Sequence, residues 1–359
     1  MTQSNANLNI DEYLRQRLMP VMGAVPKLTG IDMYGDSIPA ETASGDLFEY
    51  IEFKERYDLD ARIRRANRES QDFIERRRFA APVRNSVDDH VEWLKARPNY
   101  DQTKELEYRR ARSEEQVRLA EDLQLLYKTV GLLLVDAQGH GVISAKIAST
   151  VHDTFHALLL SEIDHRGKTT PELFERLNLR LAQSVTARHA LRVTEGESAR
   201  ETATFLYGEV HSDGYIRFVN FGHPPPLVFS AEYRKFMKID DCMVRFLPLG
   251  LQIPEDHPDR KKYLSIQFRQ SRANTSDVAE ITLMSPGDIL FLYTDGVFDG
   301  SDSEELERLQ SIMQMHCCNS AKEICAALFE YAVHRDARLI QYGDGDLVDD
   351  KTILIVKRV

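Results

Sequence analysis

The chain has 359 residues, enough for one large domain or two ordinary ones. Its 57 acidic and 46 basic residues give a formal net charge of -11, which argues against a chain that coats nucleic acid or an anionic membrane. Apolar runs reach only five or six residues, far short of the roughly 20 that span a bilayer. Residues 1–11 are polar and have no apolar stretch, so no signal peptide is expected, and the four cysteines form no CxxC pair. These features predict a cytoplasmic protein with reduced thiols.

The first third of the chain changes character twice. Residues 1–27 are expected to form an N-terminal arm with one short helix, and alternation over residues 31–53 predicts short strands. Residues 54–122 then carry 17 basic and 16 acidic residues, so the negative excess lies elsewhere. Apolar spacing over residues 54–126 predicts three amphipathic helices, at 59–77, 87–94 and 106–126. Two hypotheses for this insertion stay open: a solvated helical hairpin, or a dimerising or regulatory coiled coil.

The remainder of the chain mixes strands and helices. Helices are predicted at residues 143–159, from 171 onward, at 303–315 and at 321–334. Strands are predicted at residues 129–135, 202–210, 215–221, 227–230, 281–284, 289–294 and 352–357. Because the strands come as hairpins rather than as repeated βαβ units, the pattern favours an α+β fold over a parallel α/β fold.

Four aspartates lie where predicted strands begin or end, beside glycine or a second acid. They are Asp46, Asp136, Asp295 and Asp349. Asp46 begins one strand and Asp136 ends another, so antiparallel pairing of these strands would bring both carboxylates to one edge. Asp295 likewise ends a strand and Asp349 precedes one, which predicts a second pair.

Four clustered carboxylates are costly unless a cation neutralises them, because like charges resist burial together. All-oxygen ligand sets favour Mg²⁺, Mn²⁺ or Ca²⁺ over zinc. Two such ions about 3.5–4 Å apart would hold and ionise a water for attack on phosphorus. The cluster therefore predicts a two-metal hydrolase. The chain has no GxSxG, GxGxxG or P-loop motif, which disfavours serine-hydrolase, dinucleotide-binding and nucleotide-triphosphatase functions.

Six motifs resemble, in the same order, those of the SpoIIE-type phosphatases, a branch of the metal-dependent PPM or type 2C class. They are Pro39-Ala40 with Ser44-Gly45-Asp46, Asp136 to Gly141, Asn220 to Pro226, Pro248 to Leu251, Tyr293 to Val297 and Asp349 to Val356. The resemblance covers residues 28–53 and 128–359. It implies an α/β/β/α sandwich of two mostly antiparallel sheets, forming a phosphatase domain over residues 28–359 that is interrupted by the 54–126 insertion.

The same resemblance implies a site and a reaction. Asp136 would bridge two Mn²⁺ or Mg²⁺ ions, and the Ala137 carbonyl would face the second of them. Asp46 would complete the second ion, while Asp295 and Asp349 would hold the first. The implied substrate is phosphoserine or phosphothreonine on a protein, such as an anti-sigma-factor antagonist.

This sequence departs from the family pattern in two ways. Ser44 and Glu49 stand where relatives usually have glycine and aspartate, and we expect Glu49 to alter the outer shell of the metal site. The insertion replaces a short hairpin turn, about 25 Å from the metals, so we expect it to supply no metal ligand. It could instead bind a regulatory partner or a second copy of the chain. The alternative to an enzyme is a catalytically silent scaffold that binds a partner through the insertion.

Overall fold

The computed structural model describes residues 23–41, 43–75, 102–139, 141–191, 202–239, 245–251, 279–283, 285–298, 300, 302–343 and 348–359. The helices predicted within the N-terminal arm and at 87–94 lie outside these residues. The chain divides into two compact units. Unit 1 comprises Met1–Glu52, Lys128–Leu158 and Pro171–Val359, and unit 2 comprises Phe53–Tyr127 and Leu159–Thr170. The predicted domain boundaries at residues 28, 54 and 126 stay predictions.

Unit 1 contains two β-sheets. The first has, in spatial order, β1 (Ile31–Ile38), β11 (Lys351–Arg358), β10 (Ile289–Tyr293), β6 (Leu227–Ser230) and β7 (Lys235–Met237). The second has β2 (Asp46–Glu52), β3 (Thr129–Ala137), β4 (Ala203–His211), β5 (Tyr215–Phe221) and β8 (Arg245–Phe246), while β9 (Ala279–Thr282) pairs with β5. Among these described strands, only β5 and β8 pair in parallel.

The two sheets pack face to face, and the two-residue period of a strand decides which side chains fill the space between them. On β2 the inward residues are Phe48 and Tyr50, and on β3 they are Leu132 and Leu134. The opposite sheet contributes even-numbered residues of β10 and β11, while their odd-numbered residues face a second apolar cluster. This alternation also fixes where the polar residues at the strand ends point.

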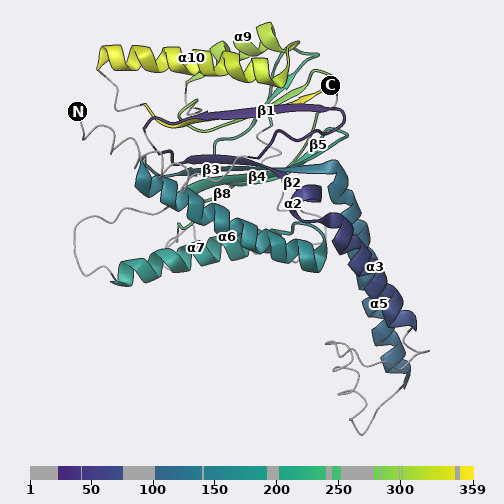
Figure 1. The fold of residues 1–359 in the computed structure, drawn as a ribbon. Coiled ribbons are helices and arrows are strands. Elements are labelled where there is room, and N and C mark those ends of the chain that lie inside the picture. The colour runs from purple at the N-terminus through teal and green to yellow at the C-terminus, as the bar shows by residue number, and fades with distance from the viewer. Residues whose placement is uncertain are drawn as a thin grey trace, which may run out of the picture. The chain divides into compact units, whose positions relative to one another are not determined.

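Helices cover the outer face of each sheet (Figure 1). α9 (Ser303–His316) and α10 (Ala321–Tyr342) lie against the first sheet and share its outer apolar cluster. α6 (Val142–Arg166) and α7 (Pro171–Leu191) lie against the second sheet, where Phe155 and Phe174 pack on Phe205. The last part of α6, from residue 159, belongs to unit 2. The predicted α+β sandwich is confirmed.

Unit 2 is built around a pair of helices inserted between β2 and β3. It contains α2 (Phe53–Arg56), α3 (Leu59–Glu75), α5 (Gln102–Leu125) and most of the short 3₁₀ helix Leu126–Lys128. α3 and α5 pack against each other, and the hydroxyls of Ser70 and Ser113 lie 2.9 Å apart in their buried interface. Ala66, Ala120 and Leu123 of the predicted apolar stripes are buried, but Leu106 and Val117 of the third stripe are exposed, so that stripe is buried only toward its C-terminal end.

Sequence patterns missed the two shortest of the described strands. β7 has three residues and β8 has two, and neither is long enough to show an alternation. α10 also continues eight residues beyond the predicted end at residue 334 before Gly343 terminates it with a left-handed backbone conformation. Within the described residues, no helix combines the length and apolar character needed to cross a membrane.

Candidate active site

Asp46 and Asp136 meet at one end of the β2–β3 pair. These strands are antiparallel, and the register places Asp46 directly opposite Asp136. Both residues share strand parity with the inward-facing side chains of their strands, so their carboxylates point into the layer between the sheets. The structure thus has the antiparallel pairing that the sequence argument required. The other end of this strand pair, at Glu52 and Val130, lies six strand steps from the aspartates, or about 20 Å.

Asp46 is held from the opposite sheet by two hydroxyl groups. Its Oδ2 accepts a hydrogen bond of 2.6 Å from Thr294 Oγ1 and one of 2.9 Å from Thr352 Oγ1. Thr294 follows β10 and Thr352 lies in β11, so Asp46 crosses the layer between the sheets to reach them. This contact places the end of β2 beside the strand ends that carry the other two aspartates.

Asp295 and Asp349 lie at the adjoining ends of β10 and β11. The two strands are antiparallel, and Thr294 N donates to Thr352 O at 3.1 Å just beyond their paired residues. The chain packs so closely here that a Cβ atom on Gly296 would lie 2.0 Å from the carbonyl oxygen of Asp350. Only glycine allows the two turns to approach this far, which explains the Asp-Gly sequence at residues 295–296.

Asp350 positions the loop that precedes Asp46. It is buried, its Oδ1 accepts from Ala40 N at 2.7 Å, and its Oδ2 accepts from Gly45 N at 2.6 Å. Gly45 in turn packs on β3, where an added Cβ would lie 2.8 Å from the Ala137 carbonyl oxygen. The Asp350 side chain and the close packing of Gly45 therefore link the motifs at residues 39–46, 136–137 and 349–350.

The C-terminal helix braces both acidic turns, a feature that the sequence argument missed. Arg335 of α10 donates to the carbonyl oxygens of Gly296 and Val297, the latter at 2.7 Å. Its neighbour Asp336 forms an ion pair with buried Lys351, whose Nζ also donates to Asp349 O at 2.6 Å. The adjacent Arg335-Asp336 pair is a weak signal in sequence, because a charged pair on a helix is usually solvated.

The electrostatics of the cluster favour a bound cation. Burial and the neighbouring carboxylates of Asp295, Asp349 and Asp350 raise the pKa of Asp136 from 3.8 to about 8. Burial and Asp136 likewise raise the pKa of Asp46, although the hydroxyls of Thr294 and Thr352 oppose this rise. These carboxylates resist ionising together, and added positive charge would relieve that cost.

Asn220 and His223 stabilise the turn that follows β5. Asn220 exchanges two hydrogen bonds of 2.9 Å with the backbone of His223, and His223 Nδ1 lies 2.8 Å from Thr204 Oγ1, as expected for a rigid turn. Burial lowers the pKa of His223 to about 3, so its imidazole is neutral.

The expectation that Glu49 alters the outer shell of the metal site is wrong. Glu49 lies three residues from Asp46, hence on the opposite face of β2, where it contacts α6 rather than the aspartates.

Comparisons with known proteins agree with this architecture. The model of the family "Stage II sporulation protein E (SpoIIE)" matches residues 127–359. A search of curated proteins found no significant match. Among solved structures, the chain is similar to the RsbU and RsbW domains of Rv1364c from Mycobacterium tuberculosis, with 16% identity and a TM-score of 0.50. That match covers 94% of this chain and 62% of the other, and at this identity it supports the fold alone.

Two further solved structures are similar at lower scores. The PP2C phosphatase domain and regulatory fragment of SpoIIE from Bacillus subtilis has 14% identity and a TM-score of 0.49, covering 92% of this chain and 64% of that one. The SiaA-PP2C domain of Pseudomonas aeruginosa has 11% identity and a TM-score of 0.49, covering 100% and 98%. This chain thus spans less than two thirds of the first two structures. Because the family model matches more than half of it, the chain belongs to the SpoIIE family of PP2C-type phosphatases.

Proposed function

We propose that this protein is a metal-dependent phosphatase that hydrolyses phosphoserine or phosphothreonine on a protein. The observation that carries the proposal is the convergence of the ends of β2, β3, β10 and β11, which bear Asp46, Asp136, Asp295 and Asp349. Membership of the SpoIIE family supports the same activity.

The residues present suit two Mn²⁺ or Mg²⁺ ions. Asp136 would bridge both ions, Asp46 and the Ala137 carbonyl would complete one, and Asp295 and Asp349 would complete the other. All of these donors are oxygen atoms, which hard divalent cations prefer. The raised pKa of Asp136 fits this assignment, because a cation would favour its ionised form. When bound, such ions activate water and neutralise charge on the transferring phosphoryl group.

The rest of the site serves to position these donors. Thr294 and Thr352 orient the Asp46 carboxylate by donating to a single oxygen, Oδ2. Asp350 fixes the backbone before Asp46, and Gly45 allows that backbone to approach the Ala137 carbonyl. Preorganised donors of this kind lower the cost of binding and orienting charge during reaction.

The substrate and the control of activity form the finer part of the proposal. We propose a phosphoprotein substrate, such as an anti-sigma-factor antagonist, and a regulatory partner or second copy bound through unit 2. Unit 2 offers a suitable surface, since its cavity of about 660 Å³ is lined by both signs of charge, including Arg62, Arg65, Arg112, Glu69 and Glu115. Such mixed charge suits a specific protein partner better than a nucleic acid.

The test is hydrolysis of a phosphoserine peptide by the purified chain in Mn²⁺ and in EDTA. We expect turnover only with the metal, and a loss of roughly a thousandfold in Asp136→Asn, because one bridging carboxylate is removed. Asp213→Asn is the matched control. Asp213 accepts from Tyr215 N at 3.0 Å in the turn after β4, a bond that asparagine can also make, so this variant should keep full activity.

The competing scaffold hypothesis gives a different result. A scaffold would show no Mn²⁺-dependent turnover of the peptide, and no turnover of a phosphoprotein either, although the chain is folded. Equal activity of wild type and Asp136→Asn would contradict the assignment of the site.

A further inference from the structure

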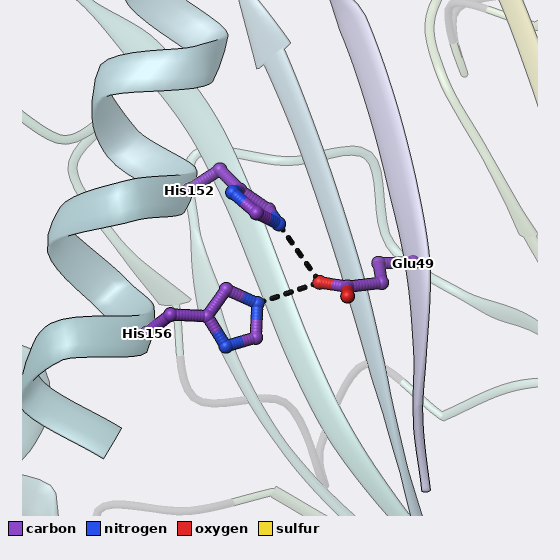
Figure 2. A group of neighbouring side chains, drawn as sticks. All are labelled: Glu49, His152 and His156. Atoms are coloured by element: carbon purple, nitrogen blue, oxygen red, sulfur yellow. Dashed lines mark hydrogen bonds and ion pairs between the residues drawn. The ribbon is translucent and has the colours of Figure 1, made fainter. Parts of the chain in front are cut away.

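A second polar cluster lies on the opposite face of β2 from Asp46. Figure 2 shows Glu49 of β2 pointing toward His152 and His156 of α6. Glu49 Oε2 lies 2.9 Å from His152 Nε2 and 2.6 Å from His156 Nε2. The side chain of Glu49 is 2% exposed, and those of the two histidines are 9% and 12% exposed. Three groups that can bind a metal thus converge in a largely buried position.

The spacing of the donor atoms suits a single ion. A four-residue separation places His152 and His156 on one face of α6, with their ring centroids 4.4 Å apart. One ligand atom from each of the three residues lies within 4.8 Å of the others. A tetrahedral zinc ion with bonds of about 2.1 Å needs ligand atoms about 3.4 Å apart. The two hydrogen bonds to Glu49 would therefore have to lengthen by less than about 1 Å to admit the ion.

The environment of His152 also resembles that of a metal ligand. Histidines that bind metals through one ring nitrogen commonly donate the other N–H to a carboxylate, which fixes the tautomer. His152 Nδ1 lies 3.2 Å from Asp153 Oδ1, while its Nε2 faces Glu49. A hydrogen bond donated by Nδ1 to Asp153 would leave Nε2 available for a metal.

We propose that Glu49, His152 and His156 form a site for one transition-metal ion of the zinc type. Two imidazole nitrogens and one carboxylate are a zinc ligand set that leaves a fourth position for water. The aspartate cluster offers only oxygen atoms and suits harder cations, so the two sites would select different metals. Zinc needs both Nε2 atoms unprotonated, so any proton held between a histidine Nε2 and Glu49 would pass to solvent when the ion binds.

Such an ion would tie α6 to β2. Glu49 lies three residues from Asp46, and α6 begins five residues after Ala137, so the ion would connect the two segments that lead into the aspartate cluster. This proposal does not rest on the phosphatase activity, because it can be tested by metal binding alone.

The experiment uses the full chain, stripped with a chelator and kept in excess Mg²⁺ to occupy oxygen-ligand sites. Titration with Zn²⁺ should show one tight site, and X-ray absorption of the zinc-loaded wild type should show two imidazole ligands. Loss of a direct ligand in His156→Gln should weaken zinc binding by more than about 100-fold, and Asp153→Asn should weaken it by about tenfold. His165→Gln, an exposed histidine of the same helix, is the matched control and should bind zinc like wild type.

Several outcomes would overturn the proposal. They are the absence of tight zinc binding, an all-oxygen ligand shell in the wild-type protein, and unchanged affinity in a folded His156→Gln variant. The X-ray absorption measurement needs no variant, so it decides the matter even if the substitution prevents folding. If any of these outcomes is found, Glu49 holds the two histidines by hydrogen bonds alone.

Discussion

The two faces of β2 present polar groups of different chemistry only three residues apart. The inward face carries Asp46, which meets Asp136 and hydroxyls from the opposite sheet. The outward face carries Glu49, which meets two histidines of α6. The first cluster depends on four strand ends and very close backbone contacts, whereas the second depends on one helix packed against one strand. The alternation of side chains along β2 is what separates a cluster of oxygen atoms from a cluster of nitrogen and oxygen atoms.

The largest expected difference between the two clusters is in their response to Gly296→Ala, which should damage the aspartate cluster and leave the Glu49 cluster intact. The new methyl group would lie 2.0 Å from the Asp350 carbonyl oxygen, so the turns bearing Asp295 and Asp349 must move apart. We expect a loss of about 3 kcal/mol in the free energy of unfolding, together with loss of peptide hydrolysis. Denaturant unfolding and a hydrolysis assay measure these effects, and zinc binding at Glu49 should persist in the folded fraction.

Gly208→Ala is the control for this substitution. An added Cβ at this position in β4 meets its nearest atom, Phe218 Cβ, at an ordinary 3.5 Å. Its free energy of unfolding should stay within about 1 kcal/mol of wild type. Similar destabilisation by both substitutions would show that the close contact between Gly296 and Asp350 does not cause the loss of stability.

A smaller effect should appear in the dependence of stability on pH. Because the pKa of Asp136 is about 8 in the folded protein and near 3.8 when unfolded, the folded state binds more protons between about pH 4 and about pH 8. The melting temperature in EDTA should therefore fall as the pH rises through this window. Mn²⁺ should oppose the fall, since it favours the ionised carboxylate, and Asp136→Asn should flatten it. Equal slopes for wild type and Asp136→Asn in EDTA would contradict the raised pKa.

The smallest effect is expected from shortening the insertion. Joining residue 72 to residue 111 by a short glycine-serine turn removes the outer part of the α3–α5 pair but keeps Ala66, Ala120 and Leu123. Peptide hydrolysis and zinc affinity should stay within roughly twofold of wild type, because the shortened chain keeps every residue assigned to either cluster. Loss of metal binding by a folded, shortened chain would refute this. Light scattering on both chains would also reveal any dimer formed through the insertion.

Much of this architecture could be predicted from local patterns. The apolar run at residues 129–135 and the alternation near residue 46 indicated β3 and β2, and antiparallel pairing then brought Asp46 to Asp136. The order of the six motifs predicted the two-sheet sandwich through the resemblance to SpoIIE-type phosphatases. These signals involve single segments or pairs of strands. They are reliable because each strand buries at least one face, which fixes the side to which its residues point.

The rest depends on contacts that join distant parts of the chain. Asp350 accepts a hydrogen bond from Gly45 N, 305 positions away in the sequence. Arg335 of α10 donates to the carbonyl oxygen of Gly296, in the turn after β10. No short pattern encodes such pairs. The Glu49 cluster did leave a signal, since His152 and His156 have helical i, i+4 spacing, but only the parity of β2 shows that Glu49 faces them.

The position of β11 has a consequence for the order of events during synthesis. β11 contains residues 351–358 yet lies in the interior of its sheet, between β1 and β10. A ribosome therefore releases both neighbouring strands, and the whole of α10, before the strand that joins them exists. Until then Asp46 lacks the Thr352 hydroxyl and the Gly45 loop lacks Asp350. If the proposed function is right, a chain synthesised only as far as β10 should bind neither the metal ions nor the substrate, and hydrolysis should begin only after β11 has paired.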